Sequence, residues 1–197
     1  MPDPTARQLL LGTHRGDAEA AARLYRRFAP RMLAYARALL GRSARTGVAD
    51  DAVQQAFVHV LAARAEVVER VEDELAWLIR LTRNAALNAR RTQTRSALRE
   101  KMRAGLERRT PSSAADGSLE ELLAAVSTLE DDHRELLLLR HVAGLTFEQM
   151  ALALEENRNT LATRYRAALV RLREMMPAKN PTRHAAATFR PTEVHHE

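Results

Sequence analysis

The chain has 197 residues, enough for one large or two small domains, and its 46% hydrophobic and 28% charged residues are ordinary for a globular protein. Only 4% are aromatic, with 7 Gly and 7 Pro, which disfavours a β-sandwich or barrel. The absence of Cys excludes disulfides, thiolate catalysis, iron–sulfur clusters and cysteine-based zinc sites. No stretch approaches about 18 consecutive apolar residues, and the first residues lack a secretory core, so we expect a helical, cytoplasmic protein.

Charge is unevenly distributed along the chain. The 31 basic and 25 acidic residues give a net charge of +6. Residues 75–109 carry ten basic side chains against two acidic ones, and residues 158–173 carry five Arg and no acid. Residues 119–156, between them, carry nine acids against two Arg. Two basic segments that flank an acidic one predict two separate contacts with a polyanion, although a solvated helix face would have the same composition.

The first part of the chain shows helical spacing in two stretches. Asp17 is a candidate N-cap for the first stretch, which Pro30 is expected to interrupt before the apolar pattern continues to Leu40. Residues 41–47 have the composition of a loop, and the next helix is expected to open at Asp50. Apolar residues at offsets of three and four give that helix one buried face, made of Val53, Ala56, Phe57, Val60 and Leu61.

A long helix is predicted from Leu75 to Arg91, after an acidic segment that suits a helix N-terminus. Its apolar stripe is expected to bury Trp77, the single Trp. Beyond Arg91 the pattern weakens, and residues 110–118 have linker composition. The predicted organisation is a first domain at residues 13–95, a linker at 96–117, a second domain at 118–176 and a disordered tail at 177–197.

The second domain is predicted to hold four helices, of which the last two form a helix-turn-helix. Thr146 and Gln149 have the spacing of a capping box for a short helix that ends at Leu154. The helix after the turn is expected to start near Asn159 and to offer its first turns to the major groove of DNA. The side chains that can reach bases or phosphates are Arg158, Asn159, Thr160, Thr163, Arg164 and Arg166. The alternative is an amphipathic helix with a solvated Arg face.

These residues resemble a known family. The stretch LTFEQMALALEENRNTLATRYRAALVRLRE, residues 145–174, is similar to region 4 of extracytoplasmic-function sigma factors, the small bacterial subunits that direct core RNA polymerase to promoters. DDAVQQAF, residues 50–57, and WLIRLTRNAALNARR, residues 77–91, resemble two signatures of region 2. The resemblance spans residues 16–176 and implies an all-α protein with two small helical domains joined by a flexible linker.

The resemblance also implies roles for particular residues. Asp51, Gln54 and Gln55 would dock on the clamp helices of the polymerase, whereas without the family they would be a capping Asp and two solvated Gln. The helix at residues 77–91 would melt and read the −10 element. Phosphate contacts would come from Arg80, Arg83, Arg90 and Arg91, and contacts to unpaired bases from Asn84 and Asn88. The helix-turn-helix would read the −35 element, and an anti-sigma factor would be a further partner beside core polymerase and promoter DNA.

The sequence departs from the family pattern in three places. The turn carries Glu155 and Glu156 where the family has Gly and an apolar residue, which leaves Asn157 as the expected residue at positive φ. The segment before Trp77 is acidic, which predicts an unusual −10 preference. Asn88 and Gln55 replace the usual Asp and Glu and keep their hydrogen-bonding capacity.

No enzyme site is apparent in the sequence. The seven His are scattered except for His195 and His196, and the chain has no nucleophile signature and no Gly-rich phosphate loop. We therefore expect no catalytic activity, no cofactor and no resident metal. Two alternatives to a sigma factor stay open: a sigma-like protein that binds polymerase or an anti-sigma factor without initiating transcription, and a plain helix-turn-helix regulator that uses only the second domain.

Overall fold

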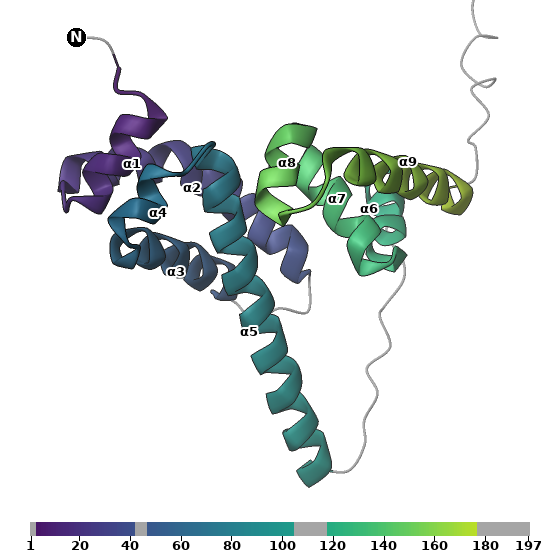
Figure 1. Cartoon of the computed structure of the whole chain (residues 1–197). Coiled ribbons are helices and arrows are strands. Elements are labelled where there is room, and N and C mark those ends of the chain that lie inside the picture. Colours follow the sequence, from purple (N-terminus) through teal and green to yellow (C-terminus); the bar gives the residue numbers. More distant parts are fainter. Residues whose placement is uncertain (1–2, 42–46, 105–117, 177–197) are drawn as a thin grey trace, which may run out of the picture.

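The computed structural model describes residues 3–41, 47–104 and 118–176, and within these ranges all regular structure is α-helical (Figure 1). The predicted all-α fold is therefore confirmed. The first domain contains α1 (Ala6–His14), α2 (Ala18–Leu40), α3 (Val48–Ala62), α4 (Ala65–Glu69) and α5 (Glu74–Ala104). The second contains α6 (Ser118–Thr128), α7 (Asp131–His141), α8 (Phe147–Leu154) and α9 (Arg158–Met175). None of the helices described has the length and apolar character needed to span a membrane.

Helix α1 was not anticipated from the sequence. It opens with a capping box in which the Thr5 hydroxyl accepts from the Gln8 N–H at 3.2 Å and the Gln8 side chain accepts from the Thr5 N–H at 2.8 Å. Leu9 and Leu10 are buried against the rest of the first domain. The Thr-x-x-Gln spacing is the same signal that identified the start of α8, and it was available in the sequence.

Helix α2 runs unbroken through Pro30, so the predicted interruption is wrong. Asp17 caps the helix as expected, since its carboxylate accepts from the Glu19 and Ala20 N–H groups at 2.9 and 3.1 Å. Pro30 is exposed, while Phe28 and Met32 on either side of it are buried in the core. Proline removes one backbone hydrogen bond. Burial on both sides of it holds the helix together across that gap.

Helix α4 lies in a charged segment for which no helix was predicted, while α3 and α5 were predicted with different ends. Helix α3 begins at Val48, two residues before the predicted Asp50, after Gly47 in a left-handed conformation. Helix α5 is preceded by Asp73, whose carboxylate accepts from the Ala76 N–H at 2.7 Å. It continues to Ala104, so residues 96–104, which were assigned to the linker, are helical. Residues 105–117 lie outside the described part of the chain.

In the second domain, α8 and α9 form the predicted helix-turn-helix, and the capping box of Thr146 and Gln149 is present. The turn is built differently from the prediction. Glu155, not Asn157, takes the left-handed conformation, with φ of 57°. Asn157 instead caps α9, its side chain accepting from the Asn159 N–H at 2.8 Å, so α9 starts at Arg158. The predicted disordered tail, residues 177–197, lies outside the described residues.

The two domains pack against each other. Figure 1 shows α8 beside the upper part of α5, while the far end of α5 projects beyond the bundle. Helix α8 contacts α5, and α7 contacts α2. One continuous cluster of buried apolar side chains includes first-domain residues such as Tyr35 and Ile79 and second-domain residues such as Leu139 and Met150. The first-domain basic helix therefore lies directly against the acidic part of the second domain.

Candidate nucleic-acid interface

Helix α5 is amphipathic, with one apolar face that is buried and one polar face. Leu78, Ile79, Thr82 and Ala86 are buried, and Trp77 lies in the core, as predicted, with 8% of its surface exposed. The candidate −10 residues follow one another at helical spacings on the other face. Among them, Asn84, Asn88 and Arg91 are exposed to solvent, whereas Arg80, Arg83 and Arg90 are partly covered.

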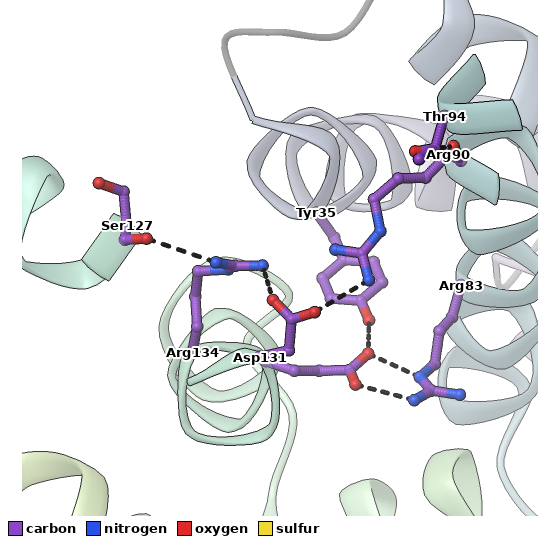
Figure 2. A network of polar contacts seen from close by, with 8 residues as sticks. Tyr35, Arg83, Arg90, Thr94, Ser127, Asp131 and Arg134 are labelled. Carbon is purple, nitrogen blue, oxygen red and sulfur yellow. Dashed lines mark hydrogen bonds and ion pairs between the residues drawn. The ribbon is translucent and has the colours of Figure 1, made fainter. Parts of the chain in front are cut away.

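The three covered arginines form ion pairs with carboxylates of the second domain. Arg83 forms a two-pronged pair with Glu135, with Nε–Oε1 and Nη2–Oε2 distances of 2.6 and 2.8 Å. Arg90 contacts Asp131 at 3.1 Å, and Arg80 contacts Glu155 (Figure 2 shows the contacts of Arg83 and Arg90). The sequence analysis assigned these guanidinium groups to phosphates and did not anticipate partners inside the chain. The signal for such partners was the acidic run between the two basic segments.

A buried tyrosine completes the contact around Glu135. The Tyr35 hydroxyl donates to Glu135 Oε1 at 2.8 Å, from a ring that is completely buried (Figure 2). Burial, reinforced by the neighbouring carboxylate, raises the pKa of Tyr35 well above its ordinary value of 10.0. The hydrogen bond to Glu135 raises the pKa of Arg83, so this side chain is firmly cationic. We call Tyr35, Arg83 and Glu135 the Glu135 cluster; no sequence signal pointed to Tyr35 as a member.

The candidate −35 residues lie at the N-terminal end of α9, and all six are exposed. Buried Leu161 and Ala168 hold the helix to the domain, together with Tyr165, whose hydroxyl lies 2.8 Å from His141 Nε2. Two of the six are already paired: Arg158 contacts Glu148 at 3.0 Å, and Arg164 contacts Glu156 at 2.7 Å. The surface at the start of α9 therefore holds cations that could contact phosphates, next to the carboxylates of Glu148 and Glu156, which pair with two of those cations.

The candidate polymerase-binding residues lie on one exposed face of α3. Asp51, Gln54 and Gln55 are all exposed, at helical spacings that continue to Val58 and Leu61. Those two apolar side chains are 52% and 53% exposed, so the polar face continues into exposed apolar surface. The sequence analysis placed Leu61 in the core. An exposed face that combines amide and apolar side chains has the composition of a protein–protein interface.

The acidic segment before Trp77 lines an open cleft between the two domains. The cleft has a volume of about 360 Å³, with walls formed by residues 70–73, Val67, Trp77 and Arg80 of the first domain and by Ala151, Leu152 and Glu155 of the second. The Gln149 amide donates across the domain boundary to Asp73 at 2.8 Å. No cluster of three or more metal-ligating side chains occurs among the described residues.

Comparison with known proteins identifies the family. Residues 24–96 match the Sigma-70 region 2 family. The chain is 35% identical over 144 residues to the RNA polymerase sigma factor CarQ of Myxococcus xanthus, an alignment that covers 68% of this chain and 76% of CarQ. The chain belongs to the sigma-70 family of RNA polymerase sigma factors. Within that family it is a sigma factor of the extracytoplasmic-function type, as the sequence resemblance implied.

Solved structures share the fold of this sigma factor. CnrH, in a structure with the cytosolic domain of CnrY, superposes with a TM-score of 0.64 at 20% identity, covering 87% of this chain and 97% of CnrH. RpoE of Bartonella quintana, in a structure with the anti-sigma factor NepR, gives a TM-score of 0.58 at 23% identity, covering 81% and 98%. The sigma factor therefore shares its overall helical fold with these proteins.

Proposed function

We propose that this sigma factor binds core RNA polymerase and directs it to promoters by opening the −10 element with α5 and reading the −35 element with α9. The observation that carries the proposal is the polar face of α5. There, exposed Asn84 and Asn88 stand among four arginines within the segment that matches Sigma-70 region 2. Amides can hydrogen-bond unpaired bases while guanidinium groups hold the phosphates, which is the chemistry that strand opening requires.

Polymerase binding is assigned to the α3 face. Asp51, Gln54 and Gln55 would supply polar contacts, and exposed Val58 and Leu61 would extend the interface with apolar area. The start of α9 would enter the −35 major groove through the six exposed residues from Arg158 to Arg166.

In this role the chain would act by binding polymerase and promoter DNA, and it would catalyse no reaction itself. The polymerase carries out RNA synthesis, so we expect the chain itself to have no catalytic activity and to need no cofactor. A factor with this role works in the cytoplasm, where core polymerase and promoter DNA are found. By analogy with RpoE in its structure with NepR, we also expect an anti-sigma factor as a partner.

The proposal is tested by co-purification with bacterial core polymerase and by run-off transcription from the promoter of the chain's own gene. We expect start-site-specific RNA. Arg91→Ala should lower permanganate reactivity of the −10 thymines, because exposed Arg91 is available for a phosphate. Thr92→Ala is the matched control, since Thr92 is the exposed neighbour of Arg91 and its hydroxyl donates to the Asn88 carbonyl of its own helix at 3.0 Å. Absence of polymerase binding would overturn the proposal.

One alternative is favoured by a specific observation. Three of the four arginines assigned to the −10 element are paired with carboxylates of the same chain. A sigma-like protein that occupies polymerase without opening promoters would have such neutralised arginines permanently. It predicts stable polymerase binding with no transcript from any promoter tested, whereas the sigma-factor proposal predicts a transcript.

A further inference from the structure

Helix α1 has no part in the proposed function as stated above. It lies before residues 24–96, the segment that matches Sigma-70 region 2. The helix is nevertheless held firmly in the first domain. Leu9 and Leu10 are buried, and the Nδ1 atom of His14 lies 3.3 Å from the Val60 carbonyl oxygen of α3. A side chain on α1 therefore projects from a fixed base.

Arg7 of α1 reaches across to the end of α4. Its Nη1 donates to the carbonyl oxygens of Val68 and Val71 at 2.9 and 3.0 Å, and its Nη2 donates to that of Glu69. The last carbonyls of a helix have no partner within the helix, and α4 has only five residues, too few to be stable by itself. One guanidinium thus ties the end of α4, and the chain that follows it, to α1.

The chain that follows α4 is the acidic loop at residues 70–73, here called the 70–73 loop. It lines the same cleft as Trp77 and Arg80, and Arg80 is one of the candidate −10 residues. At its end, the Asp73 carboxylate accepts from the Ala76 N–H of α5 at 2.7 Å. The loop is therefore fixed at both ends, by Arg7 and by α5, and it lies at the start of the polar face of α5.

Two side chains of the 70–73 loop are suited to contact a base. Arg70 and Glu72 are exposed, whereas Asp73 is partly covered and caps α5. A guanidinium donates to the acceptors of guanine, and a carboxylate accepts from the amino group of cytosine. Such hydrogen bonds depend on direction as well as distance, so the choice of base depends on how the loop backbone is held.

We propose that Arg7 is a positioning residue for the −10 element, because it fixes the 70–73 loop and thereby sets which base the loop accepts. The inference rests on the proposed function, since the loop meets a base only when α5 binds the −10 element. Arg7 acts through the loop backbone: both of its Nη groups donate to carbonyls of residues 68–71. Lysine could not replace it fully, because one ammonium lacks the forked pair of donors.

The first measurement follows the loop in the free, full-length chain. Amide hydrogen exchange is compared between the wild type, Arg7→Ala, Arg7→Lys and Arg15→Ala. Arg15 is the matched control, because it is an exposed arginine at the other end of α1. We expect faster exchange of residues 66–73 in Arg7→Ala, as local opening produces, with residues 48–62 of α3 unchanged. Arg7→Lys should give an intermediate rate.

The second measurement uses holoenzyme assembled with core polymerase. Variants of the promoter of the chain's own gene, with each single-base change in the −10 and −35 elements, are transcribed together in one reaction. Transcript ratios from one reaction do not depend on the active fraction of protein, so a loss of stability alone leaves them unchanged. In Arg7→Ala the preference at the −10 position that the loop reads should fall about tenfold, within the discrimination of one side chain–base contact. The −35 ratios, and all ratios for Arg15→Ala, should equal those of the wild type.

A third comparison identifies the route of the effect. A chain with Arg70→Ala and Glu72→Ala lacks both exposed charged groups of the 70–73 loop. If Arg7 acts through that loop, Arg7→Ala should change the −10 ratios little further in this background, because coupled residues are not additive. A full additional effect would mean that Arg7 acts on promoter choice by another route and would overturn the proposal.

The remaining outcomes are equally decisive. Unchanged exchange at residues 66–73, or a rise that extends through α3, would overturn the positioning role. Faster local exchange with unchanged −10 ratios would overturn the link to promoter choice. Ratios restored by Arg7→Lys while exchange stays fast would assign the effect to charge and overturn it too. A wild type that yields no start-site-specific RNA rejects the proposed function, and the effect on base choice with it, while hydrogen exchange still decides whether Arg7 holds the loop.

Discussion

Arg164 of the recognition helix forms a 2.7 Å ion pair with Glu156 of the turn that precedes it. Both side chains are partly exposed, at 43% and 39%. The family pattern has an apolar residue at the position of Glu156, so in the proposed −35 complex a carboxylate here would place negative charge beside the DNA phosphates. The pair holds Arg164 near the start of α9, and the proposed phosphate or base contacts would compete with Glu156 for its donors.

Removing the arginine should weaken −35 recognition. We expect Arg164→Ala to lower duplex promoter affinity by about 1–3 kcal/mol, the usual loss for one specific side-chain contact. A gel shift with holoenzyme on −35 promoter DNA measures this. Arg171→Ala is the control, since Arg171 lies nearer the end of the same helix and contacts Glu174 at 3.4 Å. Equal affinity for the Arg164 variant and wild type would remove Arg164 from the interface.

Removing the carboxylate should have the opposite effect. Glu156→Gln keeps a hydrogen-bond acceptor but removes the charge that attracts Arg164 and repels phosphate. Because the pair is partly exposed, we expect a gain of about 0.2–1 kcal/mol in duplex affinity, larger at low salt. Titration at two salt concentrations checks both points. Weaker binding would mean that Glu156 orients Arg164 for its contact.

The turn residue Glu155 should be replaceable by Gly with a gain in stability. Its φ of 57° lies in the left-handed region, where glycine is strain-free and other residues are not. Relief of the left-handed strain is worth about 1–2 kcal/mol and the entropy of glycine costs about 0.5–1 kcal/mol, so Glu155→Gly should raise the free energy of unfolding by up to about 1 kcal/mol. The lost pair with Arg80 takes little from this gain, because the Glu155 side chain is 73% exposed. Thermal unfolding measures this. Glu156→Gly, at a position without positive φ, should give no such gain, and equal effects at both positions would refute the argument.

Local signals in the sequence were enough for most helices and for the core. The caps at Asp17 and Thr146 gave the starts of two helices, and apolar spacing correctly placed Val53 and Trp77 inside. These features depend on residues within a few positions of one another. The capping box at Thr5 belonged to the same class, so α1 was predictable even though it was missed.

The packing of the domains was not predictable in this way. Tyr35 and Glu135 are a hundred residues apart, and nothing in the spacing around either residue points to the other. The charge pattern was interpreted only as two contacts with a polyanion, and the acidic run by itself does not say which of the arginines on α5 its carboxylates would meet. Pro30 shows the converse: a strong local signal for a break was overridden by burial on both sides.

Gly12 should be intolerant of any side chain. A Cβ built there would lie 2.7 Å from the Ala20 Cβ, closer than side-chain carbons approach in proteins. Gly12→Val should therefore push α1 from α2 and lower the free energy of unfolding by about 1–3 kcal/mol, as overpacking does. Denaturant unfolding gives the value. Gly12→Ala combined with Ala20→Gly should be less destabilising than the two single changes added together. Simple additivity would contradict the close approach.

The folded chain should lose stability in strong alkali. Burial, reinforced by the Glu135 carboxylate, raises the pKa of Tyr35 above 10.0, so in the folded chain the phenol holds its proton more tightly than it would in water. A group whose pKa is raised by folding contributes its full stability below its ordinary pKa. That contribution is lost as the pH rises above about 10, because a buried phenolate would then face the Glu135 carboxylate. Absorbance at the phenolate band should show a late-titrating component that Tyr35→Phe removes. The free energy of unfolding of the wild type should fall over the same pH range, and a late component that persists in Tyr35→Phe would assign it to another residue.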